Sequence, residues 1–225
     1  MSNLVLVYWD LRGICEPARM ILEYGGMEYE DRRLKIAEAK TWFAEKFCLG
    51  MDFPNLPYLI DGDIKLTESW AIYRYLGKKL NLFPSSDENQ RQADMLQGVI
   101  NDIRSAFARS MYNVDLYDKI DEIRKNQTAK IDMMEKYFTD RKFLLEDDLS
   151  FLDFALYETF NHHRLFFTDI FDKSPGIQRF MDEFESMKPI SEYLKSDRYR
   201  KFPIYGPMAT WGGKSENDRK QVANL

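Results

Sequence analysis

Cysteine and histidine are scarce in this chain. Of its 225 residues only Cys15 and Cys48 are cysteines, far apart and without a CxxC pair, and the two histidines, His162 and His163, are adjacent. The spacing argues against a disulfide framework or a zinc ribbon, and it favours a reducing compartment. Adjacent residues of a helix point in different directions, so we expect surface or interface roles for the two histidines and no metal.

Long apolar runs and basic clusters are also lacking. No stretch approaches the length of a membrane span, and the apolar residues 4–9 follow no basic leader, which predicts a strand and not a signal peptide. The net charge is −5, and no run of Lys and Arg stands out as it does in nucleic-acid binders. We therefore expect a cytoplasmic protein that binds neither membranes nor nucleic acid.

The composition that remains is that of a globular protein. Hydrophobic residues make up 44% of the chain and charged residues 31%, enough to fill a core and keep the surface soluble. A length of 225 residues fits one large domain or two modest ones, and the patterning favours two.

The first part of the chain alternates strand-like and helix-like spacing. Pro17 lies in a first helical turn, Gly25 and Gly26 follow that helix, and an Asp-Gly pair separates two strand-like runs. The elements are expected at residues 4–8, 16–24, 29–34, 39–47, 57–61, 63–66 and 67–80. The order βαβαββα predicts an α/β domain over residues 1–83.

The second part has helical spacing throughout. After a linker in which Ser85 and Glu88 match a capping pattern, apolar residues recur at helical intervals over 96–111 and 120–138. Ser150 and Asp153 predict the cap of a nearly apolar, buried helix, and Pro175 opens another. This pattern predicts an all-α domain over residues 84–211, followed by a polar tail at 212–225.

Tyr8 lies where the first strand gives way to the first helix. Ligands of α/β folds bind beyond the carboxyl ends of strands, where helix N-termini favour anions. A phenol at this place is able to donate a hydrogen bond to a thiolate and so lower the pKa of that thiol. Taken alone, Tyr8 is better explained as an ordinary packed strand residue, since tyrosine is common in strands.

Other candidate residues also carry two interpretations. Pro57 either begins a strand or follows a cis peptide that leaves the Leu56 backbone open to an extended ligand. Ser69 either caps a helix or helps its N-terminus to hold a carboxylate. Trp42 and Lys46, four residues apart on one helix, either converge on another carboxylate or belong to a plain amphipathic helix.

Together these motifs resemble a known family. The stretches "VYWDLRG", "WFAEKFCLGMDFPNLPYLIDGDIKLTES", "FLDF" and "PMATWG" are similar to those of the glutathione transferases of the mu class, in a variant with a short loop, over residues 4–213. The resemblance implies the glutathione transferase architecture, a thioredoxin-like N-terminal domain followed by an all-helical domain, in a homodimer. It also implies glutathione as co-substrate with no further cofactor, and conjugation of its thiol to small hydrophobic electrophiles.

The resemblance also implies roles for individual residues. Tyr8 matches the catalytic tyrosine, Asp102 matches an acidic residue that reaches across from the partner subunit, and Phe53 matches a hydrophobic key inserted into that partner. Glutathione is expected at Trp9, Ile14, Trp42, Lys46, Asn55, Leu56, Glu68, Ser69 and Asp102, with a cis peptide before Pro57. The electrophile is expected at Leu11, Ile14, Tyr112 and Tyr205.

The chain departs from the family pattern in three places. The segment between Tyr29 and Trp42 is short, so that Ala39 or Lys40 stands where longer loops carry an arginine, and the cleft is expected to be more open. Glu68 replaces the usual glutamine. Asn101 and Ser105 replace methionines and are expected to make the electrophile pocket more polar.

Two alternatives remain open on the sequence. Cys15, close to a helix N-terminus, would serve a cysteine-dependent thiol transferase. A non-enzymatic ligand-binding homologue would keep the fold without the chemistry.

Overall fold

A four-stranded sheet organises the N-terminal part of the computed structural model, which describes residues 4–146 and 148–214. The strands are β1 (Leu4–Trp9), β2 (Glu30–Leu34), β3 (Tyr58–Asp61) and β4 (Ile64–Thr67), in the order β2-β1-β3-β4. β1 runs parallel to β2 and antiparallel to β3, and β3 is antiparallel to β4.

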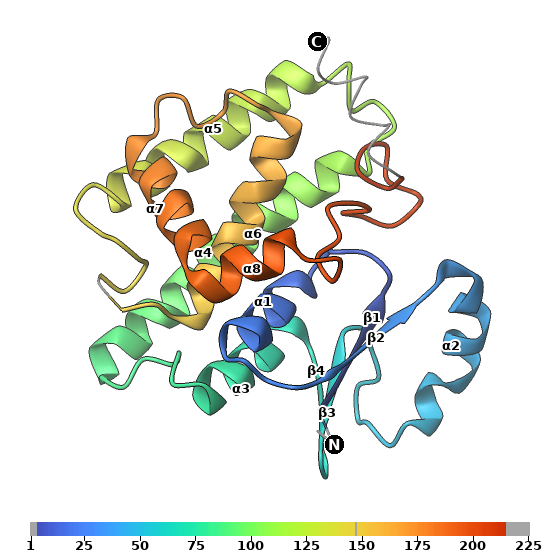
Figure 1. The fold of residues 1–225 in the computed structure, drawn as a ribbon. Helices are drawn as coiled ribbons and strands as arrows, with labels where there is room; N and C mark the ends of the chain where they lie inside the picture. The colour runs from blue at the N-terminus through green and yellow to red at the C-terminus, as the bar shows by residue number, and fades with distance from the viewer. Residues whose placement is uncertain (1–3, 147, 215–225) are drawn as a thin grey trace.

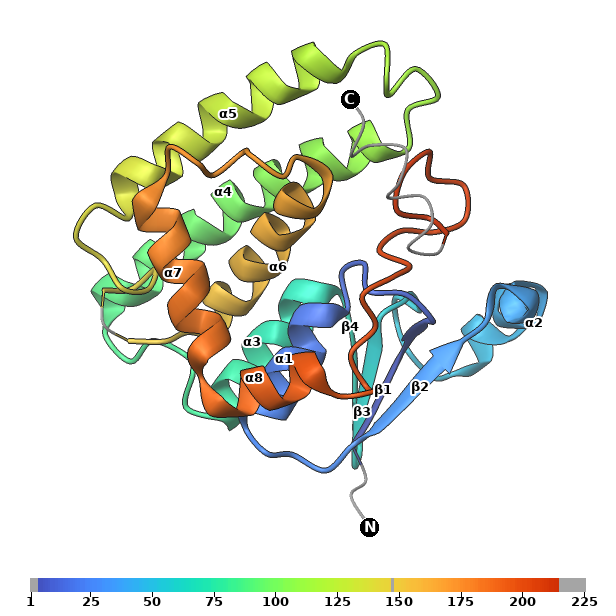
Figure 2. The same ribbon diagram turned by 45° about the horizontal axis from the view of Figure 1, so that its top comes forward.

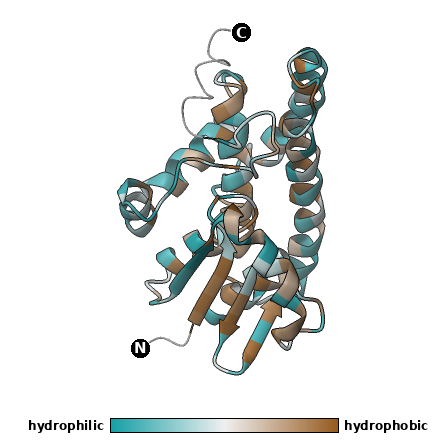
Figure 3. Ribbon diagram, turned by 90° about the vertical axis from the view of Figure 1, so that its right-hand side faces the viewer, coloured by the Kyte–Doolittle hydropathy of each residue, from teal (hydrophilic) through white to brown (hydrophobic). Residues whose placement is uncertain are grey.

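The strand sequences explain their places in the sheet. β1, LVLVYW, is almost wholly buried, whereas β2, EDRRL, is polar and lies at an edge. Figure 3 shows this contrast as a teal β2 beside a brown β1. Gly62 adopts a φ of +60° in the turn between β3 and β4, a conformation that favours glycine, so the predicted Asp-Gly hairpin is confirmed.

Helices cover both faces of this sheet. α1 (Glu16–Tyr24) and α3 (Ser69–Lys79) lie on the face toward the C-terminal helices, and α2 (Ala39–Glu45) lies on the other (Figures 1 and 2). Short 3₁₀ turns at Ile36–Glu38 and Lys46–Cys48 flank α2. The predicted order βαβαββα is therefore confirmed.

Five helices form a bundle in the described residues of the C-terminal part. They are α4 (Asp87–Met111), α5 (Ile120–Tyr137), α6 (Phe151–Phe166), α7 (Pro175–Ser186) and α8 (Lys188–Lys195). α6 is buried along nearly its whole length and contacts α1, α3 and α4, so it joins the two parts of the molecule. Among the described residues, no helix is both long and apolar enough to cross a membrane.

Two predicted helix caps have different outcomes. The box of Ser150 and Asp153 is present, with Asp153 Oδ2 accepting hydrogen bonds from the Ser150 amide (2.7 Å) and hydroxyl (2.8 Å). At α4 the prediction was wrong by one residue, because Ser86 and not Ser85 is the N-cap, and its hydroxyl oxygen accepts from the Asn89 amide.

The segment after α8 returns to the sheet. Its backbone receives hydrogen bonds from the loop after β1, from Arg12 N to Pro203 O (3.0 Å) and from Gly13 N to Ile204 O (2.8 Å). Gly212 is buried and its carbonyl accepts from Ile204 N and Tyr205 N, so packing continues into the first residues of the predicted tail. The remainder of that tail, 215–225, lies outside the described residues.

Candidate active site

Tyr8 lies at the carboxyl end of β1 and is almost covered. Its exposed fraction is 8%, and Gly13 passes so close that a Cβ there would lie 2.8 Å from the Tyr8 hydroxyl oxygen. Burial raises the pKa of Tyr8 well above its ordinary value, Cys15 adds to the rise, and a hydrogen bond from the Ile14 backbone opposes it. The phenol is therefore protonated at neutral pH and available as a donor.

An apolar cavity of about 540 Å³ opens beside Tyr8. Five parts of the chain line it: the end of β1 with its following loop, the 3₁₀ turn with α2, α4, α6, and the segment after α8. Its lining residues are Tyr8, Trp9, Leu11, Gly13, Ile14, Ile36, Ala39, Phe43, Arg104, Ala108, Tyr112, His162, Tyr205, Gly206, Pro207 and Met208. The structure thus brings together Tyr8 and all four residues expected to bind the electrophile.

Two phenols form one wall of this cavity. The rings of Tyr112 and Tyr205 meet edge to face, with their centroids 5.8 Å apart. The Gly206 amide donates a hydrogen bond to the Tyr112 hydroxyl oxygen (2.8 Å), which fixes the position of that oxygen.

Two cavity predictions were wrong, those for Asn101 and Ser105. Neither lines the cavity, and Arg104 and Ala108 of the same helix lie there instead. The Asn101 amide oxygen accepts hydrogen bonds from Trp70 (3.5 Å) and Arg104 (3.1 Å), which holds it toward α3, whereas the longer Arg104 side chain reaches the cavity.

Most residues expected to bind glutathione lie outside this cavity. Trp9 and Ile14 line it, but Trp42, Lys46, Asn55, Leu56, Glu68, Ser69 and Asp102 do not. Trp42 stacks on Tyr58, and the ammonium of Lys46 lies over the rings of Phe43 and Phe47.

The turn residues expected around glutathione have distinctive backbones. The Leu56–Pro57 peptide is cis, as the resemblance implied, and the Leu56 amide donates to the Asn55 side chain (2.9 Å). Glu68 has a φ of +69° and precedes the first residue of α3, the buried Ser69. Ser69 is therefore not the N-cap of that helix. Asp102 is exposed on α4.

Cys15 lacks the setting of a reactive cysteine. The thiol is fully buried at the start of α1, and burial raises its pKa to about 12. A neutral, inaccessible thiol is a packing residue, which argues against the alternative of a cysteine-dependent thiol transferase.

The two histidines are also in the interior, which corrects the expectation of surface or interface positions. His162 contacts Glu158 and Tyr205, whereas His163 contacts Thr159 and Gln127 and stacks on Phe107. Their hydrogen-bond partners on and beside α6 offset the cost of burying the two polar rings. The hydropathy pattern of the sequence does not reveal these partners, so it could not predict that the histidines are buried. Within the part of the chain that the structure describes, no three His, Cys, Asp or Glu side chains group as metal ligands would.

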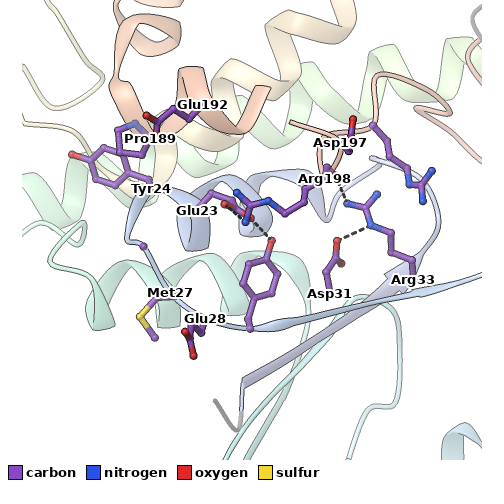
Figure 4. A pocket seen from close by; sticks show the side chains of 13 residues that line it. Glu23, Tyr24, Met27, Glu28, Asp31, Arg33, Pro189, Glu192, Asp197 and Arg198 are labelled. Atoms are coloured by element: carbon purple, nitrogen blue, oxygen red, sulfur yellow. Dashed lines mark hydrogen bonds and ion pairs between the residues drawn. The ribbon is translucent and has the colours of Figure 1, made fainter. Parts of the chain in front are cut away.

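A larger hollow of about 820 Å³ lies away from Tyr8, between α1, β2 and α8 (Figure 4). Several of its polar groups bond to one another: Arg198 and the Tyr29 hydroxyl donate to Glu23, and Arg33 donates to Asp31. None of the predicted site residues lines it, so the cavity beside Tyr8 is the candidate active site.

Known proteins resemble this chain over most of its length. Residues 4–78 match the family "Glutathione S-transferase, N-terminal domain" and residues 101–197 match "Glutathione S-transferase, C-terminal domain". Glutathione S-transferase Mu 1 of Bos taurus is 38% identical over 94% of this chain and 99% of its own, and Glutathione S-transferase 2 of Gallus gallus is 37% identical over 94% and 98%.

Solved structures agree with this assignment. The glutathione S-transferase Blo t 8 superposes with a TM-score of 0.85 at 32% identity, over 92% of this chain and 99% of its own. A Pi-class glutathione S-transferase of Onchocerca volvulus gives 0.82 at 25% identity over the same shares. The predicted architecture of a thioredoxin-like domain and a helical domain is confirmed, and the chain belongs to the glutathione S-transferase family, with mu-class proteins among its relatives.

Proposed function

We propose that this protein conjugates the thiol of glutathione to hydrophobic electrophiles, with Tyr8 as the donor that stabilises the thiolate. The observation that carries the proposal is a protonated, nearly buried phenol at the edge of an apolar cavity. A fixed donor in a site that excludes water stabilises negative charge far better than the same donor in water.

The size of the effect fits the chemistry. A free thiol has a pKa of about 8.5, so most of it is protonated at neutral pH. A hydrogen bond to a charged group contributes about 1.5–3 kcal/mol, which corresponds to a lowering of the thiol pKa by about 1–2 units. That lowering makes the nucleophile a major species at pH 7.

Glutathione is proposed to lie between the cavity and α3. The first turn of α3 at Ser69 offers free backbone amides to a carboxylate, and the positive φ of Glu68 turns the chain into that helix. Trp42 and Lys46 would hold a second carboxylate, the Leu56 backbone would pair with the cysteinyl part, and Asn55 lies beside Leu56. Glutathione is the co-substrate, and no further cofactor is proposed.

The electrophile is proposed to occupy the cavity itself. Leu11 and Ile14 supply apolar walls, and Tyr112 and Tyr205 supply the phenols. A donor such as Tyr112 stabilises the oxyanion or leaving group only as charge develops, so its effect depends on the electrophile.

The protein is proposed to act as a cytoplasmic homodimer that binds no nucleic acid. Phe53 is 78% exposed, an unusual place for a large aromatic side chain in an isolated subunit. Asp102 is exposed on α4, from where it would reach the glutathione of the partner subunit.

The test of the proposal is Tyr8→Phe. Turnover of an electron-poor aryl chloride should fall about 10- to 100-fold, because one charge-assisted hydrogen bond is lost. The pKa of bound glutathione, followed by thiolate absorbance, should rise, while glutathione affinity changes little. Tyr24→Phe, on α1 and outside the cavity, is the matched control. An unchanged pH–rate profile in Tyr8→Phe would contradict the role of this hydroxyl.

A further inference from the structure

Four buried side chains form a continuous polar chain that ends in the cavity. Arg12 donates two hydrogen bonds to Glu158, from Nε to Oε1 (2.9 Å) and from Nη2 to Oε2 (2.6 Å). Glu158 Oε1 lies 2.8 Å from His162 Nε2, and His162 Nδ1 lies 3.3 Å from the Tyr205 hydroxyl. His162 and Tyr205 both line the cavity.

The partners determine where the protons lie. Burial alone would raise the pKa of Glu158, but Arg12 and His162 outweigh it and hold that pKa below its ordinary value. The ionised carboxylate only accepts hydrogen bonds, so the proton of the imidazole is on Nε2. Burial lowers the pKa of His162, Glu158 opposes this, and the charges of Arg12 and Arg104 add to the lowering. In the neutral ring, Nδ1 accepts the hydroxyl proton of Tyr205.

The two phenols of the cavity are therefore held in different ways. Tyr205 directs its proton to His162, into the protein. Tyr112 accepts from the Gly206 amide, and among residues 4–146 and 148–214 its own hydroxyl donates no hydrogen bond. Tyr205 thus contributes a fixed aromatic wall, and Tyr112 contributes a donor.

We propose that His162 is a positioning residue of the electrophile cavity: it holds the Tyr205 ring through the Tyr205 hydroxyl and leaves Tyr112 as the phenol that donates to the electrophile. The inference rests on the proposed function, because it takes this cavity as the electrophile site. The Arg12–Glu158 pair, which joins the loop after β1 to α6, anchors the imidazole in turn.

Two substitutions of His162 separate its two contacts. In His162→Gln the amide still reaches Glu158 but the acceptor at the position of Nδ1 is lost, whereas His162→Asn keeps an acceptor near Nδ1 and loses the contact with Glu158. We expect His162→Gln to raise the KM of the aryl chloride about two- to tenfold, as the loss of one neutral hydrogen bond implies. His162→Asn should raise this KM less than His162→Gln does, because it keeps the acceptor for Tyr205 and loses only the anchor to Glu158.

Tyr205→Phe provides an independent variant of the same contact. It should raise the electrophile KM as His162→Gln does, and the double variant should add no further increase, because both changes remove one interaction. The KM of glutathione and the pKa of its bound thiol should stay unchanged in every variant.

His163→Gln is the matched control, since it is a buried histidine of the same helix that does not line the cavity. It should leave the electrophile KM unchanged even where Tm falls. Suppose that the wild type is active. If His162→Gln and Tyr205→Phe then keep the wild-type KM, or if their effects on KM add in the double variant, this inference alone is overturned. A wild-type protein without conjugating activity overturns the proposed function as well.

Discussion

Gly13 shows how closely single residues are fitted around Tyr8. It has a φ of +48°, and a Cβ there would lie 2.8 Å from both the Tyr8 hydroxyl oxygen and Leu11 Cδ1. Its amide donates to Ile204, so the backbone cannot move away without losing a contact between the loop and the C-terminal segment. The position of the Tyr8 hydroxyl therefore depends on residue 13 having no side chain.

Gly13→Ala should impair both stability and turnover. The left-handed backbone costs alanine about 1 kcal/mol, and the methyl group would displace Tyr8 or Leu11. We expect a several-fold fall in kcat and a rise in the pKa of bound glutathione. Gly62→Ala is the control, because it has a similar φ of +60° with open space around the position. Equal losses of kcat in the two variants would contradict the crowding argument.

At the scale of the element, α6 depends on a buried cap. Asp153 accepts hydrogen bonds from the Leu144 amide (2.8 Å) and from the Ser150 amide and hydroxyl. Burial raises the pKa of this carboxyl to about 6, although these hydrogen bonds act in the opposite direction. The first turn of α6, the helix that joins the two parts of the molecule, therefore contains a carboxyl group, that of Asp153, whose pKa is raised.

Asp153→Asn should lower the free energy of unfolding by about 2 kcal/mol at pH 7, because the amide group would face backbone donors. In the wild type the raised pKa means that the folded chain retains a proton between about pH 4 and 6 that the unfolded chain releases. That stabilisation is present below about pH 4 and is lost as pH rises through 6.

The difference between wild type and variant should therefore widen as pH is lowered from 7 to 4, measured by urea unfolding at one protein concentration. The exposed Asp182→Asn is the control for charge loss. A difference that does not depend on pH would refute the titration of Asp153.

At the scale of the whole molecule, the surface carries exposed aromatic side chains on the segments around β3. Phe53 is 78% exposed on the turn before β3, and Phe47 is 73% exposed on the 3₁₀ turn after α2. In a two-fold symmetric dimer, a side chain that is buried at the interface is buried in both copies of the chain.

Phe53→Ser should weaken the proposed dimer. Burial of one phenylalanine contributes about 1.5–3 kcal/mol, so two copies contribute at least about 3 kcal/mol. The dimer Kd, measured by analytical ultracentrifugation, should rise about 100-fold or more. Val114→Ser, 85% exposed between α4 and α5, is the control and should leave the Kd unchanged. A Phe53→Ser protein that dimerises like the wild type would exclude this side chain from the interface.

Local features of this protein follow from the sequence by itself. The strand at β1, the helix opened by Pro17, the Asp-Gly hairpin and the cap of Ser150 with Asp153 each depend on residues a few positions apart. Backbone conformation and capping are decided over such short distances, so residue spacing predicts them. The place of Tyr8 at a strand end that precedes a helix start was predictable for the same reason, whereas its catalytic role was implied only by the resemblance to the family.

Only the tertiary structure decided which distant side chains meet. Arg104 and His162 enter the cavity, Asn101 turns toward Trp70, and burial leaves Cys15 without the reactivity that the thiol-transferase alternative needs. The Arg12–Glu158 pair spans 146 positions, and no local pattern marks either partner. Burial and the pKa of a group depend on everything packed around it, and those neighbours come from parts of the chain that only the fold brings together.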